Sequence, residues 1–148
     1  DEPVARMKYA EHYAAVNEVG FMTEDRWGFT IGYSPDGLVG DDGLIEIKSR
    51  RAKNQLAVVL DGGVPIANMA QMQAGMLVSG RSWCDYVSYS AGMHLYVKRV
   101  EPEPQWFDAI VAAVEAFENK AADMIKQYQA LTAGLHMTER NALQGMVI

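Results

Sequence analysis

Residues 34–48 have the sequence SPDGLVGDDGLIEIK, which predicts a tight β-hairpin with Asp36, Glu46 and Lys48 outside its turn. A strand over 44–48 would send Glu46 and Lys48 to one face and the two isoleucines to the other, because side chains alternate along a strand. The sequence therefore predicts a strand that packs through its isoleucines and presents a charged pair on the opposite face.

The turn of this hairpin decides which residues share a face. The sequence DDG at 41–43 is typical of a three-residue loop that ends with glycine in the left-handed region, so we expect a positive φ at Gly43. This loop would place Asp36 opposite Lys48 and would group Asp36, Glu46 and Lys48 on one side of the hairpin. A two-residue turn would separate them.

The grouped side chains suit metal chemistry, because carboxylates and backbone carbonyls are suitable ligands for Mg²⁺. Asp36 and Glu46 would supply the carboxylates and Ile47 the carbonyl. Lys48 would orient a water molecule or offset charge on a pentavalent phosphate. These residue types indicate metal-dependent hydrolysis of phosphodiesters. The alternative is a solvated hairpin with a surface Glu-Lys pair, since an isolated E-x-K triplet is common.

Motifs elsewhere in the chain resemble those of one nuclease family and occur in its order. SPDGL at 34–38, followed by an apolar strand with EIK at 46–48, resembles the PD-(D/E)xK nucleases, specifically the lambda-exonuclease type of phage recombination exonuclease, also called YqaJ-like. EPVAR at 2–6 resembles the E-x-x-A-R helix of that family, and MAQMQ at 69–73 resembles its A-Q-x-Q helix motif. Linked motifs in order are more specific than a single pattern.

The resemblance implies an α/β fold in which a central mixed β-sheet is flanked by helices. It implies that Asp36 and Glu46 are metal ligands, that Lys48 is the catalytic lysine, that Glu2 is a further active-site acid and that Gln71 faces the site from a helix. The implied activity is Mg²⁺-dependent digestion of duplex DNA from its 5′ end, with Mn²⁺ as a substitute ion.

The resemblance also implies partners and a setting. A full-length member would assemble as a ring-shaped trimer and work with a single-strand annealing protein in homologous recombination, in the cytoplasm of a bacterium that carries the phage or prophage. Because the sequence begins inside the first motif, we expect residues 1–148 to form a single nuclease domain without the N-terminal part of the family domain. Two alternatives stay open: an endonuclease or repair nuclease of the same fold, and a non-catalytic nucleic-acid-binding domain.

The composition limits these interpretations without deciding among them. With 148 residues, of which 49% are hydrophobic, the chain can bury one core, and no apolar run reaches the length of a membrane span. A net charge of −6 is unusual for a DNA-binding protein, so local basic residues matter more. Arg50, Arg51 and Lys53 directly follow the predicted strand. They are either contacts for a DNA backbone or part of a solvated loop.

The remaining elements follow from hydrophobic periodicity and turn residues. The segments with the apolar spacing of helices are 2–16, 65–79 and 105–131. The segments with the character of strands, which would form a meander with the first hairpin, are 19–23 and 27–33. A second hairpin is expected over 85–100, and a short helical pattern lies between Gly134 and Gly145.

The helix expected from Pro65 to a cap at Gly80 carries a polar strip. Helical angles place Asn68, Gln71 and Gly75 near one another. This strip would face either the carboxylates of the hairpin or the solvent.

Overall fold

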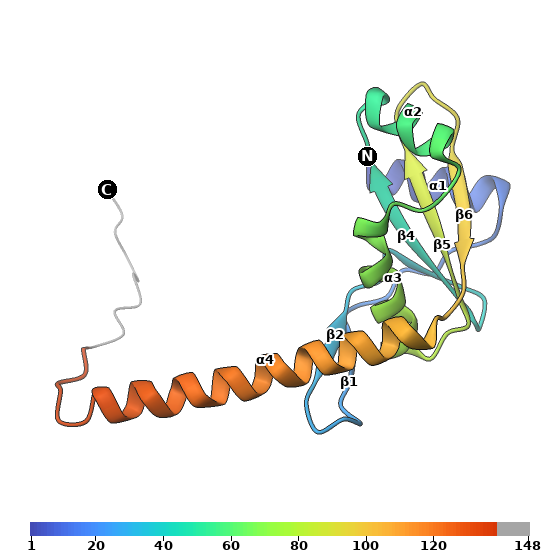
Figure 1. Cartoon of the computed structure of the whole chain (residues 1–148). Coiled ribbons are helices and arrows are strands. Elements are labelled where there is room, and N and C mark those ends of the chain that lie inside the picture. The colour runs from blue at the N-terminus through green and yellow to red at the C-terminus, as the bar shows by residue number, and fades with distance from the viewer. Residues whose placement is uncertain (139–148) are drawn as a thin grey trace, which may run out of the picture. The chain divides into compact units, whose positions relative to one another are not determined.

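The computed structural model describes residues 1–138, and Figure 1 shows its elements in chain order. The chain divides into two compact units, Asp1–Glu115 and a second that begins at Ala116. The boundary falls within α4 (Pro104–Leu131). The candidate site belongs to the first unit. Within residues 1–138, none of the helices has both the length and the apolar character needed to cross a bilayer.

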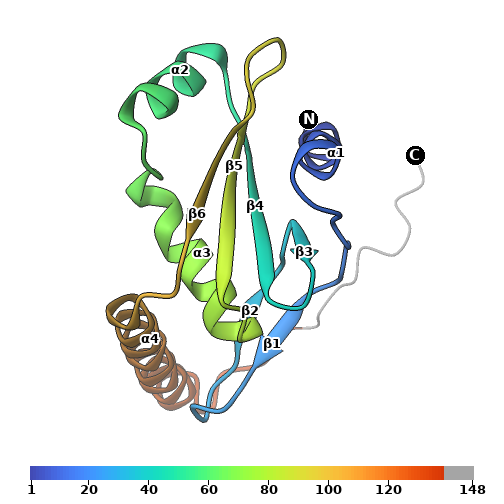
Figure 2. The same ribbon diagram turned by 90° about the vertical axis from the view of Figure 1, so that its right-hand side faces the viewer.

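A four-stranded mixed sheet forms the centre of the first unit (Figure 2). Its strands in spatial order are β3 (Gly37–Val39), β4 (Gly43–Ser49), β5 (Trp83–Tyr89) and β6 (Tyr96–Val100). β4 and β5 are parallel, whereas β3–β4 and β5–β6 are antiparallel. Parallel neighbours need a long crossover connection, which here contains α2 (Ala52–Asp61) and α3 (Ile66–Ser79).

Helices lie on both faces of this sheet, as the family resemblance implied. α1 (Glu2–His12) lies on one face, where it shares a buried cluster with Ile45 and Ile47 of β4. α3 lies on the other face and shares a cluster with Leu44, and Figure 2 shows the two helices on opposite sides of β4. Because side chains alternate along β4, Glu46 lies on the α3 face.

Most of the expected elements are present. α1 ends at His12, earlier than expected, and α3 ends as predicted with Gly80 in the left-handed conformation. The β5–β6 hairpin and α4 also match the predictions. The helical pattern expected between Gly134 and Gly145 lies largely outside the described residues.

Two expectations about elements are wrong. The predicted meander is absent, because β1 (Met22–Glu24) and β2 (Ile31–Tyr33) form a separate two-stranded sheet. Pro35 follows β2 and has no N–H to continue a ladder into β3. The second difference is α2, which begins within the basic segment after β4 and was not predicted. The N-terminus of α2 has no acidic residue in its first turn and no side-chain cap, so it lacks the usual helix signals.

The turn of the first hairpin lies one residue earlier than expected. Val39 pairs with Gly43, so the three-residue loop is 40–42, and the left-handed glycine is Gly40, with a φ of 54°. The predicted positive φ at Gly43 is wrong. Gly43 is a strand residue against the Trp83 ring, where an added Cβ would lie 2.1 Å from the ring carbon Cζ2.

The corrected turn changes the partners across the hairpin but not the shared face. Leu38 pairs with Leu44, and extending this register by two residues beyond Leu38 would bring Asp36 level with Glu46, not with Lys48 as predicted. The two registers differ by an even number of residues, and side chains change face only when the register moves by an odd number. Asp36, Glu46 and Lys48 therefore still share a face.

Candidate active site

Glu46 lies at the centre of the site and is completely buried on the α3 face of β4. Its Oε1 accepts a hydrogen bond from Lys48 Nζ at 2.5 Å, and its Oε2 accepts one from the Tyr33 hydroxyl at 3.4 Å. Burial raises the pKa of Glu46 to about 7; the hydrogen bond from Lys48 opposes this rise, and the charge of Asp36 adds to it. The site therefore favours a second positive charge near Glu46.

Asp36 is half-buried just before β3. Its Oδ2 accepts a hydrogen bond from the backbone N–H of Ile47 at 2.6 Å. The carboxylate therefore occupies the position that a backbone carbonyl of a neighbouring strand would otherwise take. Burial raises the pKa of Asp36, and the hydrogen bond from Ile47 opposes the rise. The N–H and C=O of one strand residue point to the same edge, so the carbonyl of Ile47 also projects toward Asp36.

The polar strip of α3 borders these groups, with Asn68 half-buried and Gln71 also exposed to solvent. Gln71 Oε1 accepts a hydrogen bond from Lys48 Nζ at 3.0 Å. Asn68 Oδ1 accepts one from Arg50 Nη2 at 2.9 Å. Asn68 and Gln71 are three residues apart on α3, while Lys48 lies in β4 and Arg50 lies one residue beyond its end. The helix and the strand thus meet through two matched polar contacts.

Gly75 continues this strip and lets Tyr33 reach the site. A Cβ at Gly75 would lie 2.6 Å from the Tyr33 ring carbon Cζ, so any larger residue would displace the ring. Tyr33 is 4% exposed, and burial raises the pKa of its hydroxyl. The neutral hydroxyl is therefore a hydrogen-bond donor to Glu46.

Glu2 lies at the margin of the site, on the first turn of α1. Its carboxylate pairs with Arg6 Nη2 at 2.6 Å, and 48% of its side chain is exposed. Arg6 Nε donates to the backbone carbonyl of Asp36 at 2.7 Å, and Arg6 Nη1 pairs with Glu18 at 3.0 Å. Glu2 is thus connected to Asp36 through Arg6, and its charge contributes to the raised pKa of Asp36.

A network centred on the buried Asp85 fixes α1 on the sheet. The Tyr9 hydroxyl donates to Asp85 Oδ2 at 2.6 Å, and Arg99 donates to both carboxylate oxygens of Asp85 at 2.8 and 2.9 Å. The Arg99 guanidinium lies over the Trp83 ring, 3.6 Å from its centroid. Because Tyr9 and Arg6 are on the same helix, this network also holds Arg6 at the Asp36 backbone.

The structure separates the three basic residues that follow β4. Arg50 is half-buried and donates to the Tyr86 hydroxyl through Nε at 3.0 Å and through Nη2 at 2.6 Å. Arg51 is the N-cap residue of α2, and Lys53 lies in its first turn. Both are exposed. Arg50 is thus positioned by neighbouring side chains, whereas Arg51 and Lys53 face the solvent.

The residues present fit a hard divalent cation such as Mg²⁺, which binds carboxylate and carbonyl oxygens. Asp36, Glu46 and the carbonyl of Ile47 offer these atoms on one side of the hairpin. Burial raises the pKa of both carboxyl groups, so a bound cation would favour their ionised forms. Within residues 1–138, no group of three or more histidine, cysteine, aspartate and glutamate side chains could hold a metal. The candidate donor set is therefore two side chains and one backbone oxygen.

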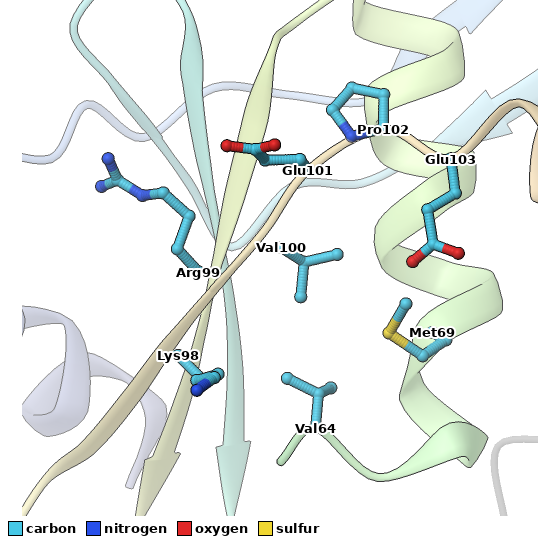
Figure 3. Close-up of a pocket in the computed structure, with 8 residues that line it drawn as sticks. All are labelled: Val64, Met69, Lys98, Arg99, Val100, Glu101, Pro102 and Glu103. Carbon is cyan, nitrogen blue, oxygen red and sulfur yellow. The ribbon is translucent and has the colours of Figure 1, made fainter.

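A separate hollow of about 710 Å³ lies beside β6. Figure 3 shows its lining residues, which are Val64, Met69, Lys98, Arg99, Val100, Glu101, Pro102 and Glu103. Gln73, the second glutamine of the A-Q-x-Q motif, donates to the Glu101 carbonyl and accepts from the Glu103 N–H, both at 2.9 Å. Gln73 therefore positions the segment before α4. The hollow is distinct from the candidate site, because none of its lining residues belongs to that site.

Comparisons with known proteins establish the family. The YqaJ-like viral recombinase domain matches residues 1–82. The crystal structure of an alkaline exonuclease (LHK-Exo) from Laribacter hongkongensis is similar, with a TM-score of 0.83 and 34% sequence identity over 91% of this chain and 72% of that chain. The structure of LHK-Exo in complex with dAMP has a TM-score of 0.82 at 34% identity, over 91% of this chain and 71% of that chain.

Among curated proteins, no match was found. The crystal structure of SSO0001 shares the fold, with a TM-score of 0.55 and 16% identity over 77% of this chain and 54% of that chain. Fold and similarity together define an α/β protein of the exonuclease and recombinase class. The chain belongs to the YqaJ-like viral recombinase domain family.

Sequence reasoning missed the roles of two residues that organise the site. Arg6 holds the backbone of Asp36, and its spacing of four residues from Glu2 was the only local signal. Tyr86 holds Arg50, but this role depends on the parallel pairing that places Tyr86 beside Glu46. No pattern within β5 indicates it.

Proposed function

We propose that this chain is a Mg²⁺-dependent deoxyribonuclease that hydrolyses the phosphodiester bonds of duplex DNA as a 5′-to-3′ exonuclease. The observation that carries the proposal is the contact of Lys48 with both the buried Glu46 and Gln71, on the face shared with Asp36. The similarity to LHK-Exo, an exonuclease crystallised with dAMP, supports DNA as the substrate.

Each site residue then has a role that its contacts support. Asp36, Glu46 and the carbonyl of Ile47 would hold Mg²⁺, and Mn²⁺ would substitute for it. When bound, the ion supplies a Lewis acid for the phosphate and for water. Lys48 is held by Glu46 and Gln71, so its ammonium is already in place to orient a water molecule or stabilise charge on the phosphate. Glu2 acts on Asp36 through Arg6.

The binding partners follow from the same proposal. Arg50, Arg51 and Lys53 would contact the phosphate backbone of duplex DNA close to Lys48. Residues 1–148 would act as one nuclease domain, as a homotrimer, and with a single-strand annealing protein in phage-type recombination. The match to a viral recombinase domain supports this setting.

The test is a digestion assay on linear and circular duplex DNA, with 5′-labelled and 3′-labelled versions of the linear substrate. We expect release of the 5′ label first, in Mg²⁺ or Mn²⁺ and not in EDTA, with the circle left intact. Cleavage of the circle would identify an endonuclease instead. Binding without cleavage under all conditions would identify a non-catalytic DNA-binding domain.

A further inference from the structure

Arg50 lies two residues beyond Lys48 and is held by neutral partners. Its Nε and Nη2 donate to the Tyr86 hydroxyl at 3.0 and 2.6 Å, and Nη2 also donates to Asn68 Oδ1 at 2.9 Å. Tyr86 is completely buried, so its hydroxyl is a fixed acceptor. The guanidinium is therefore positioned from the sheet and from α3 at once.

The charge of Arg50 is not neutralised by these contacts. Arg6, Arg26 and Arg99 each form an ion pair with a carboxylate. Among the ion pairs of residues 1–138, none includes Arg50. Within residues 1–138, the hydrogen bonds of the Arg50 guanidinium are donated by Nε and Nη2, and none is donated by Nη1. A fixed, uncompensated guanidinium with an unused edge suits a phosphate, which arginine binds through parallel hydrogen bonds.

The spacing between Lys48 and Arg50 indicates which phosphate this is. Arg50 lies one residue beyond the end of β4, where its backbone N–H still donates to the Tyr89 carbonyl at 2.8 Å. Two extended residues span roughly 7 Å and return the side chain to the same face. This is comparable to the separation of neighbouring phosphate groups in one DNA strand. α3 supports both positions, with Gln71 at Lys48 and Asn68 at Arg50. The two cations thus match two successive phosphates.

We propose that Arg50 forms a subsite for the internal DNA phosphate next to the scissile one, and that Tyr86 and Asn68 are its positioning residues. The inference rests on the proposed function, and it assigns different tasks to neighbouring cations. Lys48 serves the chemical step, whereas Arg50 serves substrate binding. Changes at Arg50 are therefore expected in Kd and KM, with little change in kcat.

The test combines DNA binding by fluorescence anisotropy in Ca²⁺, at several KCl concentrations, with steady-state digestion in Mg²⁺. Arg50→Ala should raise Kd and KM about tenfold, keep kcat within about threefold, and lower the salt dependence of log Kd by about 1. Tyr86→Phe keeps the charge and removes the acceptor, so Kd should rise about threefold with an unchanged salt dependence. The control Lys120→Ala removes one positive charge from an exposed residue of α4 that has no proposed role in binding, and it should leave Kd within about twofold of the wild type.

Several results would overturn the subsite. One is Kd within twofold of the wild type for Arg50→Ala, Tyr86→Phe and Asn68→Ala, all with unchanged thermal melting. Another is an Arg50→Ala defect confined to kcat. An effect seen only on 5′-phosphorylated duplex and not on 5′-hydroxyl duplex would assign a terminal phosphate instead of an internal one. A wild-type protein that neither binds nor cleaves DNA would contradict the proposed function itself, whereas normal wild-type activity with an unaffected Arg50→Ala contradicts only the subsite.

Discussion

Removing the charge of Glu46 should change how the stability of the metal-free protein depends on pH. The folded protein holds the Glu46 proton with a pKa of about 7, against an ordinary value of 4.5, because the side chain is buried. Because the pKa of Glu46 is raised in the folded state, its contribution to the free energy of unfolding is fully present below pH 4.5. This contribution is lost as the pH rises through 7. The loss reflects the cost of ionising a buried carboxyl.

The magnitude follows from the two pKa values. Between pH 5 and pH 8, ionisation of Glu46 should lower the free energy of unfolding by about 2.5 kcal/mol. Glu46→Gln has no proton to lose, so this part of the pH dependence should vanish. Asp36, whose pKa is also raised, remains in both proteins, so the comparison isolates the titration of Glu46 together with its charge interaction with Asp36.

The assay is urea denaturation of the wild type and Glu46→Gln in EDTA at pH 5 and pH 8. We expect the stability of the wild type relative to the variant to fall by about 2.5 kcal/mol between these pH values. Saturating Mn²⁺ should restore much of the loss for the wild type only. A relative change below about 0.5 kcal/mol, or one of opposite sign, would refute the reasoning.

Three further substitutions test the supports of the site. Gly43→Ala should lower the free energy of unfolding by about 1–3 kcal/mol through overpacking against Trp83, measured by urea denaturation; an unchanged stability would show that the ring moves freely. Arg6→Gln should weaken Mn²⁺ binding about tenfold in calorimetry, because Asp36 loses the contact to its backbone carbonyl, and unchanged affinity would contradict that positioning role. Asp85→Ala should cost about 1–3 kcal/mol of stability by leaving the buried Tyr9 hydroxyl without its acceptor, and a cost below about 0.5 kcal/mol would argue against the network.

Local periodicity predicted the parts of the site that depend on a single element. The alternation of β4 placed Glu46 and Lys48 on one face, and this survived a displaced turn because the register moved by an even number of residues. Helical angles grouped Asn68 with Gln71 on α3. Which way that strip faces was undecided, since it depends on packing between α3 and β4.

The parts that depend on distant segments were not predicted. The contact between Arg6 and the backbone of Asp36 joins residues 30 positions apart, and no local pattern encodes it. The role of Gly43 was misjudged because glycine is used both for left-handed turns and for close approach. At Gly43 the reason is close approach, because the ring of Trp83 from the parallel neighbour β5 leaves no room for a side chain. α2 escaped prediction because its N-terminus lacks an acid and a side-chain cap.

The most direct test of the central claim is anomalous diffraction from crystals soaked in Mn²⁺. We predict one or two ions bound by carboxylate oxygens of Asp36 and Glu46 and by the carbonyl of Ile47, each oxygen roughly 2.0 to 2.6 Å from the ion, with Lys48 beside them. An anomalous peak elsewhere in the protein, with Asp36 and Glu46 not bound to it, would contradict the assignment of this hairpin as the metal site of a nuclease.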